Sequence, residues 1–398
     1  MTFTQIRALE KENVMQTYGR FERAFDHGAN ATLFDTEGRA YIDFTSGIGV
    51  NSIGTANPAW VAAVSQQAAK LAHISNLYYT EPMARLAASL CGAAHMKRVF
   101  FANSGAEANE GAIKIARKYS FDKYGAGRDV IMTLQNSFHG RTVTTLSATG
   151  QDHFHNYFFP FTEGFAYTPA EDIGAMESAI KAESVCAVML ELVQGESGVL
   201  PLSKEFVTET ARLCRENDVL LIVDEVQTGV GRTGHFLACE AYGITPDIIT
   251  LAKGLGGGLP IGAVLAGETC AGTLGASDHG STFGGNPVSA AGANVVMDTV
   301  CRDSFLSDVR KKGAHLMDAI RALNAPAVHE VRGLGLMVGI VVDDGAQKKY
   351  ASAALEHGLL VLTAGRNVIR LLPPLTITYE ELDHGIQILS QVLQTEVK

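Results

Sequence analysis

An aspartate and a lysine, each directly after an apolar run, are the residues best placed to do chemistry. Asp224 follows residues 220–223, and Lys253 follows residues 247–252 and leads into a glycine-rich segment. A lysine amine can form a Schiff base with an aldehyde. Pyridoxal phosphate is such an aldehyde, and a buried carboxylate beside its ring nitrogen keeps that nitrogen protonated. The pair therefore indicates pyridoxal phosphate chemistry, with a loop aspartate and a surface lysine as the ordinary alternative.

The two apolar runs are the elements that must position this pair. Both are short, continuous and rich in β-branched residues, which predicts buried strands of a mostly parallel sheet. Strand and helix patterns alternate from residue 99 to 265, which is typical of an α/β fold, and change to an α+β pattern after about residue 303. Ligands bind at the carboxyl ends of such strands, so we expect Asp224 and Lys253 to face one cleft. We predict an N-terminal arm with part of a small domain (1–48), a large domain (49–287) and a C-terminal small domain (288–398).

A possible anion site follows the short strand expected at residues 99–101. Ser104 is a good N-cap for a helix over residues 108–119, which carries acidic residues early and basic residues late. Gly105 has no side chain to keep an anion from the free backbone N–H groups of the helix start. A bound phosphate is one interpretation, and a plain capped helix is the other.

Four further residues offer ring or anion contacts. Phe138 stands at a strand end, where it could stack on an aromatic ring, and Arg141 could hold a carboxylate with two hydrogen bonds. Ser281 and Thr282, in a glycine-rich loop, could donate to an anion. A core phenylalanine and a surface arginine remain the structural alternatives.

Two carboxylates and two histidines are open to more than one interpretation. Glu191 and Glu196 follow a buried strand at residues 185–190, and they either face the cleft or solvate a loop. His153 and His155 form an HxH pair with no third ligand nearby in the sequence, so we expect no metal site.

The segment from Gly229 to Gly234 matches the dinucleotide-binding pattern GxGxxG. That fingerprint also needs a helix directly after it and an acidic residue about 20 positions on. Here the helical pattern is too short, and the corresponding positions are Ile249 and Thr250. We interpret the segment as a loop, and keep a dinucleotide-binding regulatory protein as the alternative of a different class.

Composition limits the remaining possibilities. The chain has 398 residues, 46% hydrophobic and 19% charged, an ordinary globular balance, and its net charge of −10 argues against a nucleic-acid surface. The six cysteines have no CxxC spacing, which is typical of reduced thiols. No signal core and no run of 18 apolar residues occurs. We expect a cytoplasmic protein with no membrane partner.

Taken together, these segments resemble the class III (ω-amino acid) aminotransferases, pyridoxal phosphate enzymes of fold-type I. The matching segments come in the family's order and cover the chain from about residue 20: ANSGAEANEGAIKIAR, NSFHGRT, LVQGESGV, LIVDEVQTGVGRTG, LAKGLGGGLPIGA, GSTFGGNP and RLLPPLTIT. The compact length and the segments SGAEANE and TSGIGVNSIG most resemble the acetylornithine aminotransferases of arginine biosynthesis.

The resemblance implies how the cofactor is held. Lys253 would carry pyridoxal phosphate as an imine and then move a proton, and Asp224 would pair with the ring nitrogen. The other implied contacts are Gln227 at the ring hydroxyl, Val226 and Phe138 on the two ring faces, Ser104, Gly105 and Ala106 at the phosphate, and Ser281 and Thr282 at the phosphate of the neighbouring subunit. The implied assembly is a homodimer with shared sites.

The resemblance also implies the substrates, N2-acetylornithine and 2-oxoglutarate, which become N-acetylglutamate 5-semialdehyde and glutamate. Arg370 would bind the α-carboxylate of 2-oxoglutarate or glutamate, with Glu196 as its switchable partner. Arg141 would bind the other carboxylate, and Glu191 would lie behind these groups. Succinylornithine, ornithine, 4-aminobutyrate and an N-succinyl-diaminopimelate-type substrate remain alternatives. The family's Glu-Pro-Ile-Gln-Gly-Glu segment has Leu192 in place of proline here, which could loosen this loop.

Overall fold

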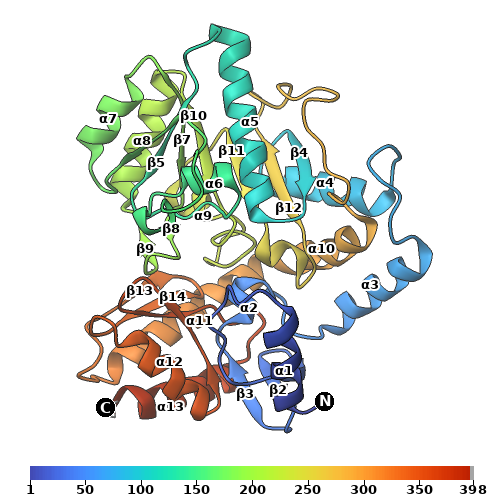
Figure 1. Ribbon diagram of the computed structural model, residues 1–398, viewed down its shortest axis with the longest axis vertical. Helices are drawn as coiled ribbons and strands as arrows, with labels where there is room; N and C mark the ends of the chain where they lie inside the picture. The colour runs from blue at the N-terminus through green and yellow to red at the C-terminus, as the bar shows by residue number, and fades with distance from the viewer. Residues whose placement is uncertain (395–398) are drawn as a thin grey trace.

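A computed structural model describes residues 1–394, and Figure 1 shows two bodies. The larger is built on a seven-stranded sheet in which β12 alone runs antiparallel to its neighbours. In spatial order the strands are β4 (Arg98–Ala102), β12 (Gly262–Ala266), β11 (Ile248–Leu251), β10 (Leu220–Asp224), β7 (Val185–Leu190), β5 (Val130–Leu134) and β6 (Phe165–Thr168). The predicted α/β class with a mostly parallel sheet is confirmed.

Both faces of this sheet are buried. Along β10, Leu221 and Val223 belong to one hydrophobic cluster, while Leu220 and Ile222 belong to another. Successive strand residues point to opposite faces, so helices must cover both sides of a continuous apolar strand. The helices of this body are α3 (Pro58–Lys70), α4 (Glu81–Ala93), α5 (Gly105–Tyr124), α6 (Val143–Ala148), α7 (Ile173–Ile180), α8 (Lys204–Glu216), α9 (Ala238–Tyr242) and α10 (Pro287–Val300).

The smaller body joins the two ends of the chain, drawn blue and orange to red in Figure 1. One sheet has the order β1–β2–β3–β15, in which Ile42 of β3 pairs in parallel with Leu359 of β15, and a second has the order β13–β14–β17–β16. The elements are α1 (Phe3–Asn13), β1 (Phe25–Ala29), β2 (Thr32–Asp35), β3 (Ala40–Asp43), α2 (Ser46–Gly49), α11 (Asp303–Ala322), β13 (Glu330–Leu334), β14 (Met337–Val341), α12 (Gln347–Glu356), β15 (Leu359–Leu360), β16 (Leu362–Ala364), β17 (Val368–Leu371) and α13 (Tyr379–Gln394). The domain limits expected at 48 and 288 stay predictions. Helix α10, which follows the second limit, packs on α3 and α4 of the larger body.

Several elements differ from the sequence-based expectations. The helix expected at residues 108–119 starts earlier, at Gly105, because the Ser104 side chain caps it by accepting the Glu107 N–H. Residues 359–364 form two short strands, β15 and β16, in different sheets. Strands β6 and β12 were not predicted, since their short runs lie among glycine and aromatic residues.

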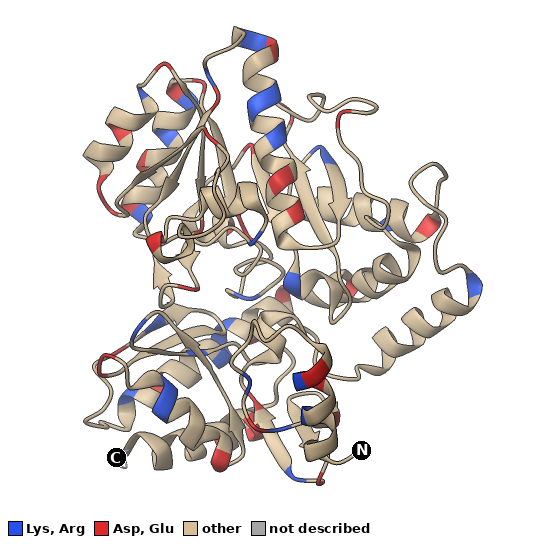
Figure 2. Cartoon of the chain, viewed as in Figure 1, with Lys and Arg blue, Asp and Glu red and all other residues tan. Residues whose placement is uncertain are grey.

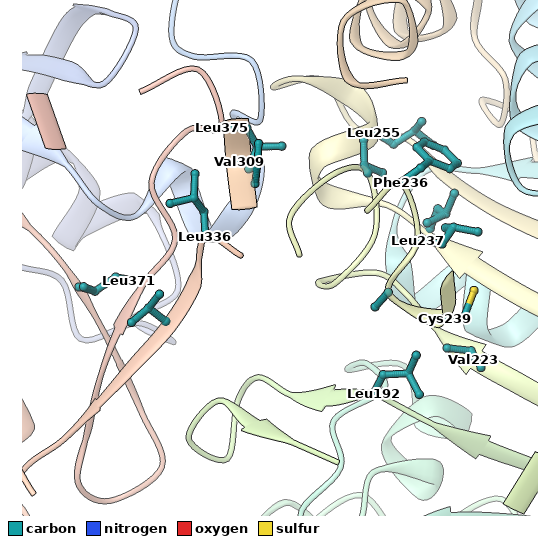
Figure 3. Close-up of a cluster of buried hydrophobic side chains, with 14 of the residues drawn as sticks. Leu192, Val223, Phe236, Leu237, Cys239, Leu255, Val309, Leu336, Leu371 and Leu375 are labelled. Carbon is teal, nitrogen blue, oxygen red and sulfur yellow. The ribbon is translucent and has the colours of Figure 1, made fainter. Parts of the chain in front are cut away.

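A shared hydrophobic core joins the bodies. Figure 3 shows its side chains from both sides, with Leu192 and Phe236 from the larger body and Leu336 and Leu371 from the smaller. Leu192 is fully buried, and its carbonyl accepts from the Leu202 N–H. The residue that replaces the family's proline is therefore packed in the core, and the loosening of its loop stays a prediction.

Candidate active site

A cavity of about 580 Å³ lies at the carboxyl ends of β10 and β11. Asp224 is the last residue of β10, and Lys253 opens η2 (Lys253–Gly256) just after β11, so the adjacent strands bring the two side chains to one cavity as expected. The predicted site residues that line it are Ser104, Gly105, Ala106, Phe138, Arg141, Glu191, Asp224, Val226, Gln227 and Lys253.

Asp224 is held by three donors. Its Oδ2 accepts from Asn109 Nδ2 at 2.8 Å and lies 2.8 Å from His139 Nδ1, while its Oδ1 accepts from the Val226 N–H at 3.0 Å. The carboxyl group is 4% exposed. Partners on both oxygens fix the orientation of this carboxyl group at the floor of the cavity.

Lys253 is strained and half-buried. Its φ of 39° lies in the left-handed region, which for a residue other than glycine costs on the order of 1–3 kcal/mol. Burial lowers the pKa of its amine, and nearby Arg370 acts in the same direction, against the carboxylates of Glu196 and Asp224. A lowered pKa raises the neutral fraction, which is the nucleophilic and proton-accepting form.

The start of α5 forms another wall. The first amides of a helix have no partner within it, and the helix dipole favours an anion there. A Cβ on Gly105 would lie 2.7 Å from Val226 Cγ1, so only glycine lets Val226 pack against this turn. In Figure 2 the first turns of α5 are coloured as acidic residues and basic residues follow further along, which suits the same dipole.

Glu191 is a second buried carboxyl group. Its Oε1 accepts from the Phe138 N–H at 2.8 Å, and it is 5% exposed. Burial raises its pKa to about 7, and the neighbouring charge of Asp224 adds to the rise. Glu191 can therefore hold a proton near neutral pH, whereas Asp224 is surrounded by donors.

Glu196 and Arg370 join the two bodies at the edge of the site. Arg370 Nη1, on β17, donates to Glu196 Oε1 at 2.6 Å and to Gln227 Oε1 at 3.1 Å. Burial opposes the ionisation of Glu196, but the charge and hydrogen bond of Arg370 lower its pKa below the ordinary value. Arg370 is 3% exposed, and its Nε has no partner among residues 1–394. Glu196 lines a neighbouring cleft between the bodies.

Three predicted residues lie at the edge of the cavity or outside it. Arg141 is exposed, with its guanidinium over the rings of Phe138 and Phe154. Ser281 accepts a hydrogen bond from Asn103 Nδ2 at 3.2 Å, and Thr282 lines a separate small pocket. Neither hydroxyl lines the main cavity of its own chain.

The segment from Gly229 to Gly234 is buried where the two bodies contact each other. Arg232 donates to the carbonyls of Leu336 and Pro373, and a Cβ on Gly234 would strike the Arg310 side chain. The segment opens no helix, since α9 begins only at Ala238. Its burial agrees with the loop interpretation.

Known proteins resemble the chain along its whole length. The sequence model of the family described as aminotransferase class-III matches residues 14–393. The chain belongs to the class-III aminotransferases. An acetylornithine aminotransferase from Haemophilus ducreyi is 52% identical over 99% of both chains, and one from Caldanaerobacter subterraneus is 48% identical over 96% of this chain and 98% of its own.

Solved structures of aminotransferases agree with the assignment of the chain to this family. The ornithine aminotransferase of Toxoplasma gondii matches with a TM-score of 0.95 at 32% identity, covering 99% of this chain and 95% of its own. The N-acetylornithine aminotransferase of Stenotrophomonas maltophilia matches with a TM-score of 0.84 at 37% identity, covering 97% of each. Within residues 1–394, no helix is long and apolar enough to cross a membrane.

As a class-III aminotransferase, the enzyme depends on pyridoxal phosphate, and the cavity fits that group. It offers a buried carboxylate for a ring nitrogen, an amine for an aldehyde and a helix start for a phosphate. Within the part of the chain described, no group of three or more His, Cys, Asp or Glu side chains could hold a metal ion.

Three residues of this aminotransferase site escaped the sequence reasoning: Asn109, His139 and Phe154. Asn109 is buried on the face of α5 that carries Ala108 and Ala112. A polar side chain in a small apolar stripe is a usable signal, because buried amides need partners. The partners of His139 and Phe154 arise from the tertiary fold, and neighbouring residues give no sign of them.

Proposed function

We propose that the enzyme transfers the δ-amino group of N2-acetylornithine to 2-oxoglutarate, giving N-acetylglutamate 5-semialdehyde and glutamate. The observation that carries this proposal is a site with two guanidinium groups in different electrostatic states. Arg370 is neutralised by Glu196 at 2.6 Å, whereas Arg141 has no ion pair among the described residues. The proposal is supported by two relatives of high identity that match nearly the whole chain, both of which are named acetylornithine aminotransferases.

The geometry of the cavity supports the following cofactor-binding roles. Bound pyridoxal phosphate supplies an aldehyde that takes up amines and a protonated ring that accepts electrons. Asp224 would hold the ring nitrogen, with Asn109 and His139 fixing its carboxylate. Gln227 would bind at the ring hydroxyl, Phe138 and Val226 would lie on the two ring faces, and the turn at Ser104, Gly105 and Ala106 would bind the phosphate.

Lys253 would hold and move the proton. Burial lowers the pKa of its amine, so a larger fraction is free to accept a proton from the substrate carbon and return it elsewhere. Glu191, placed behind the Phe138 amide, would keep the charge balance near Asp224.

The two arginines would take the two substrates in turn. An amino donor such as N2-acetylornithine would bring its amine near Lys253 and its carboxylate to Arg141, while the Glu196 carboxylate balances the charge of Arg370. With 2-oxoglutarate, one carboxylate would replace Glu196 on Arg370 and the other would bind Arg141. Planar guanidinium groups suit such two-point carboxylate binding.

We further propose a homodimer in which Ser281 and Thr282 complete the phosphate site of the neighbouring subunit. Thr282 is exposed outside its own cavity, beside a patch of strongly exposed apolar side chains that includes Leu77 (87%), Tyr79 (100%) and Phe283 (60%). Such a patch indicates a protein interface. Mixing inactive Lys253→Ala subunits with inactive Thr282→Asp subunits should restore activity, because one site of each mixed dimer keeps both residues. Mixed dimers without activity would refute shared sites.

A cytoplasmic location is supported by six free cysteines, of which Cys301 is exposed. Free thiols persist in reducing compartments. A fluorescent fusion should distribute through the cytoplasm and be absent from exported fractions.

A spectroscopic half-reaction tests the function. Adding N2-acetylornithine to the yellow holoenzyme should remove its visible absorption band, and 2-oxoglutarate should restore it. The same test with succinylornithine, ornithine and 4-aminobutyrate ranks the alternatives by kcat/KM. A band that ignores N2-acetylornithine but responds to another of these amines would overturn the proposed donor. A protein that never binds pyridoxal phosphate would overturn the site assignment as well.

A further inference from the structure

The guanidinium of Arg141 lies against two aromatic rings. Its Cζ is 4.3 Å from the ring centroid of Phe154 and 5.6 Å from that of Phe138, and the two rings meet edge to face at 5.9 Å. A guanidinium over a ring face within about 6 Å is attracted by the electron-rich face of the ring. Such a contact uses a face of the guanidinium group. The N–H groups at the edges of Arg141 therefore remain available for a carboxylate.

The backbone that carries Phe154 is fixed to the backbone that carries Phe138. The Asn136 N–H donates to the Gly150 carbonyl at 2.7 Å, and Gln151 Nε2 donates to the Ser137 carbonyl at 2.9 Å. A Cβ on Gly150 would lie 2.1 Å from the Leu134 carbonyl oxygen, so only glycine permits this close approach. Phe154 closes the short helix η1 (Asp152–Phe154), which follows directly. The two rings are therefore held on one scaffold.

Arg141 itself has no such support. It is exposed, and within residues 1–394 it makes no ion pair. A long side chain loses rotamer freedom when it binds a ligand, and a contact that orders it beforehand reduces this loss. The closer of the two rings, Phe154, is the contact that orders it.

We propose that Phe154 is a positioning residue for substrate selection: its ring orients Arg141 to receive the α-carboxylate of the acylated amino donor. This inference rests on the proposed function, in which Arg141 binds that carboxylate. Phe154 acts through Arg141 and not on the reacting atoms. Its removal should therefore weaken substrate binding and leave the chemical step unchanged.

The test compares holoenzyme variants with and without the ring. Phe154→Leu keeps an apolar side chain but removes the ring, and Phe154→Tyr keeps the ring. Phe121→Leu, at an exposed position on α5, is the matched control. Binding is measured by calorimetry with N2-acetyl-L-norvaline, which has the donor's carboxylate but no δ-amine and cannot react. Kinetics are measured with N2-acetylornithine and with N-acetylputrescine, which lacks the carboxylate.

Phe154→Leu should raise the Kd of N2-acetyl-L-norvaline and the KM of N2-acetylornithine about fivefold, which corresponds to about 1 kcal/mol for a cation–π contact. The kcat should stay within twofold, N-acetylputrescine should be unaffected, and Phe154→Tyr should behave like the wild type. In an Arg141→Ala background, Phe154→Leu should add nothing.

Three outcomes would overturn the positioning role while leaving the proposed function standing. They are unchanged binding in Phe154→Leu, an equal loss of binding in Phe154→Leu and Phe154→Tyr, and a rise in the KM of N-acetylputrescine equal to that of N2-acetylornithine. A wild-type enzyme that neither binds N2-acetyl-L-norvaline nor uses N2-acetylornithine would overturn the proposed function, and the role of Phe154 with it.

Discussion

Arg370 Nη1 donates to Glu196 Oε1 and to Gln227 Oε1, so a single guanidinium nitrogen joins β17 of the smaller body to two loops of the larger. Hydrogen bonds to charged groups contribute about 1.5–3 kcal/mol each. A substrate carboxylate that takes the place of Glu196 must compete with this bond.

Glu196→Gln should therefore shift the enzyme toward dicarboxylate substrates. With Arg370 no longer neutralised, the KM for N2-acetylornithine should rise by about tenfold or more, and the KM for 2-oxoglutarate should stay equal or fall. Stopped-flow half-reactions measure the two separately. Glu177→Gln, at an exposed position on α7, should change neither. Equal changes in both half-reactions would contradict a switching role.

Lys253→Ala should leave a folded protein with activity reduced by about 10³-fold or more, since the proposed proton carrier is lost. The variant should also lack the visible band of a lysine-bound cofactor. Near-native far-ultraviolet circular dichroism establishes that the fold survives. Lys181→Ala, which removes an exposed lysine from an ion pair with Glu177, should keep full activity. Retained turnover in Lys253→Ala would refute the assignment.

His139→Leu should weaken the binding of pyridoxal phosphate by about 10- to 100-fold, because Asp224 Oδ2 loses one of its two side-chain partners in a buried position. His139→Asn, which can still donate a hydrogen bond, should recover part of the loss. Fluorescence titration of the cofactor-free protein measures the Kd. An unchanged Kd in both variants would show that Asn109 alone suffices.

Glu191 predicts a pH dependence of the stability of the cofactor-free protein. Its folded-state pKa is about 7, above the ordinary 4.5, so the folded protein binds an extra proton between these values. Its contribution to the free energy of unfolding should be full below about pH 4.5 and decline as the pH rises to about 7, by at most about 1.4 kcal/mol per pH unit.

Urea unfolding of the wild type and Glu191→Gln between pH 5 and 8 measures this contribution. The free energy of unfolding of the wild type should fall relative to that of the variant as the pH rises to about 7. Above that pH the two curves should run parallel. Glu205→Gln, at the exposed start of α8, is the control. Parallel curves throughout would contradict the raised pKa.

Gly105→Ala should weaken the phosphate site. The new Cβ would meet Val226, whose branched side chain is stiff, at a cost of about 1 kcal/mol or more in stability. The Kd for pyridoxal phosphate should rise with it. Gly92→Ala on α4, where no atom lies within 4 Å of the new Cβ, should instead stabilise by about 0.5–1 kcal/mol. Thermal unfolding with and without cofactor separates the two effects.

Residue patterns alone predict the central strands of the site but not the contacts between the two bodies at its edge. The β-branched runs before Asp224 and Lys253 give β10 and β11, because continuous apolar strands must be buried on both faces. The pairing of Glu196 with Arg370 spans 174 positions and depends on how two bodies pack, which no local spacing encodes. The sequence resemblance named that pair, and the family and cofactor it implied are confirmed, while the individual residue roles stay predictions.

The parallel pairing of β3 with β15 has a consequence for the order of synthesis. Ile42 leaves the ribosome long before its partner Leu359. The larger body can collapse around its sheet during translation, while the N-terminal strands wait with an open edge. Arg370 arrives later still. A nascent chain can therefore acquire Asp224 and Lys253 in place, but the guanidinium proposed to select the substrate joins them only after the later strands of the smaller body have been made.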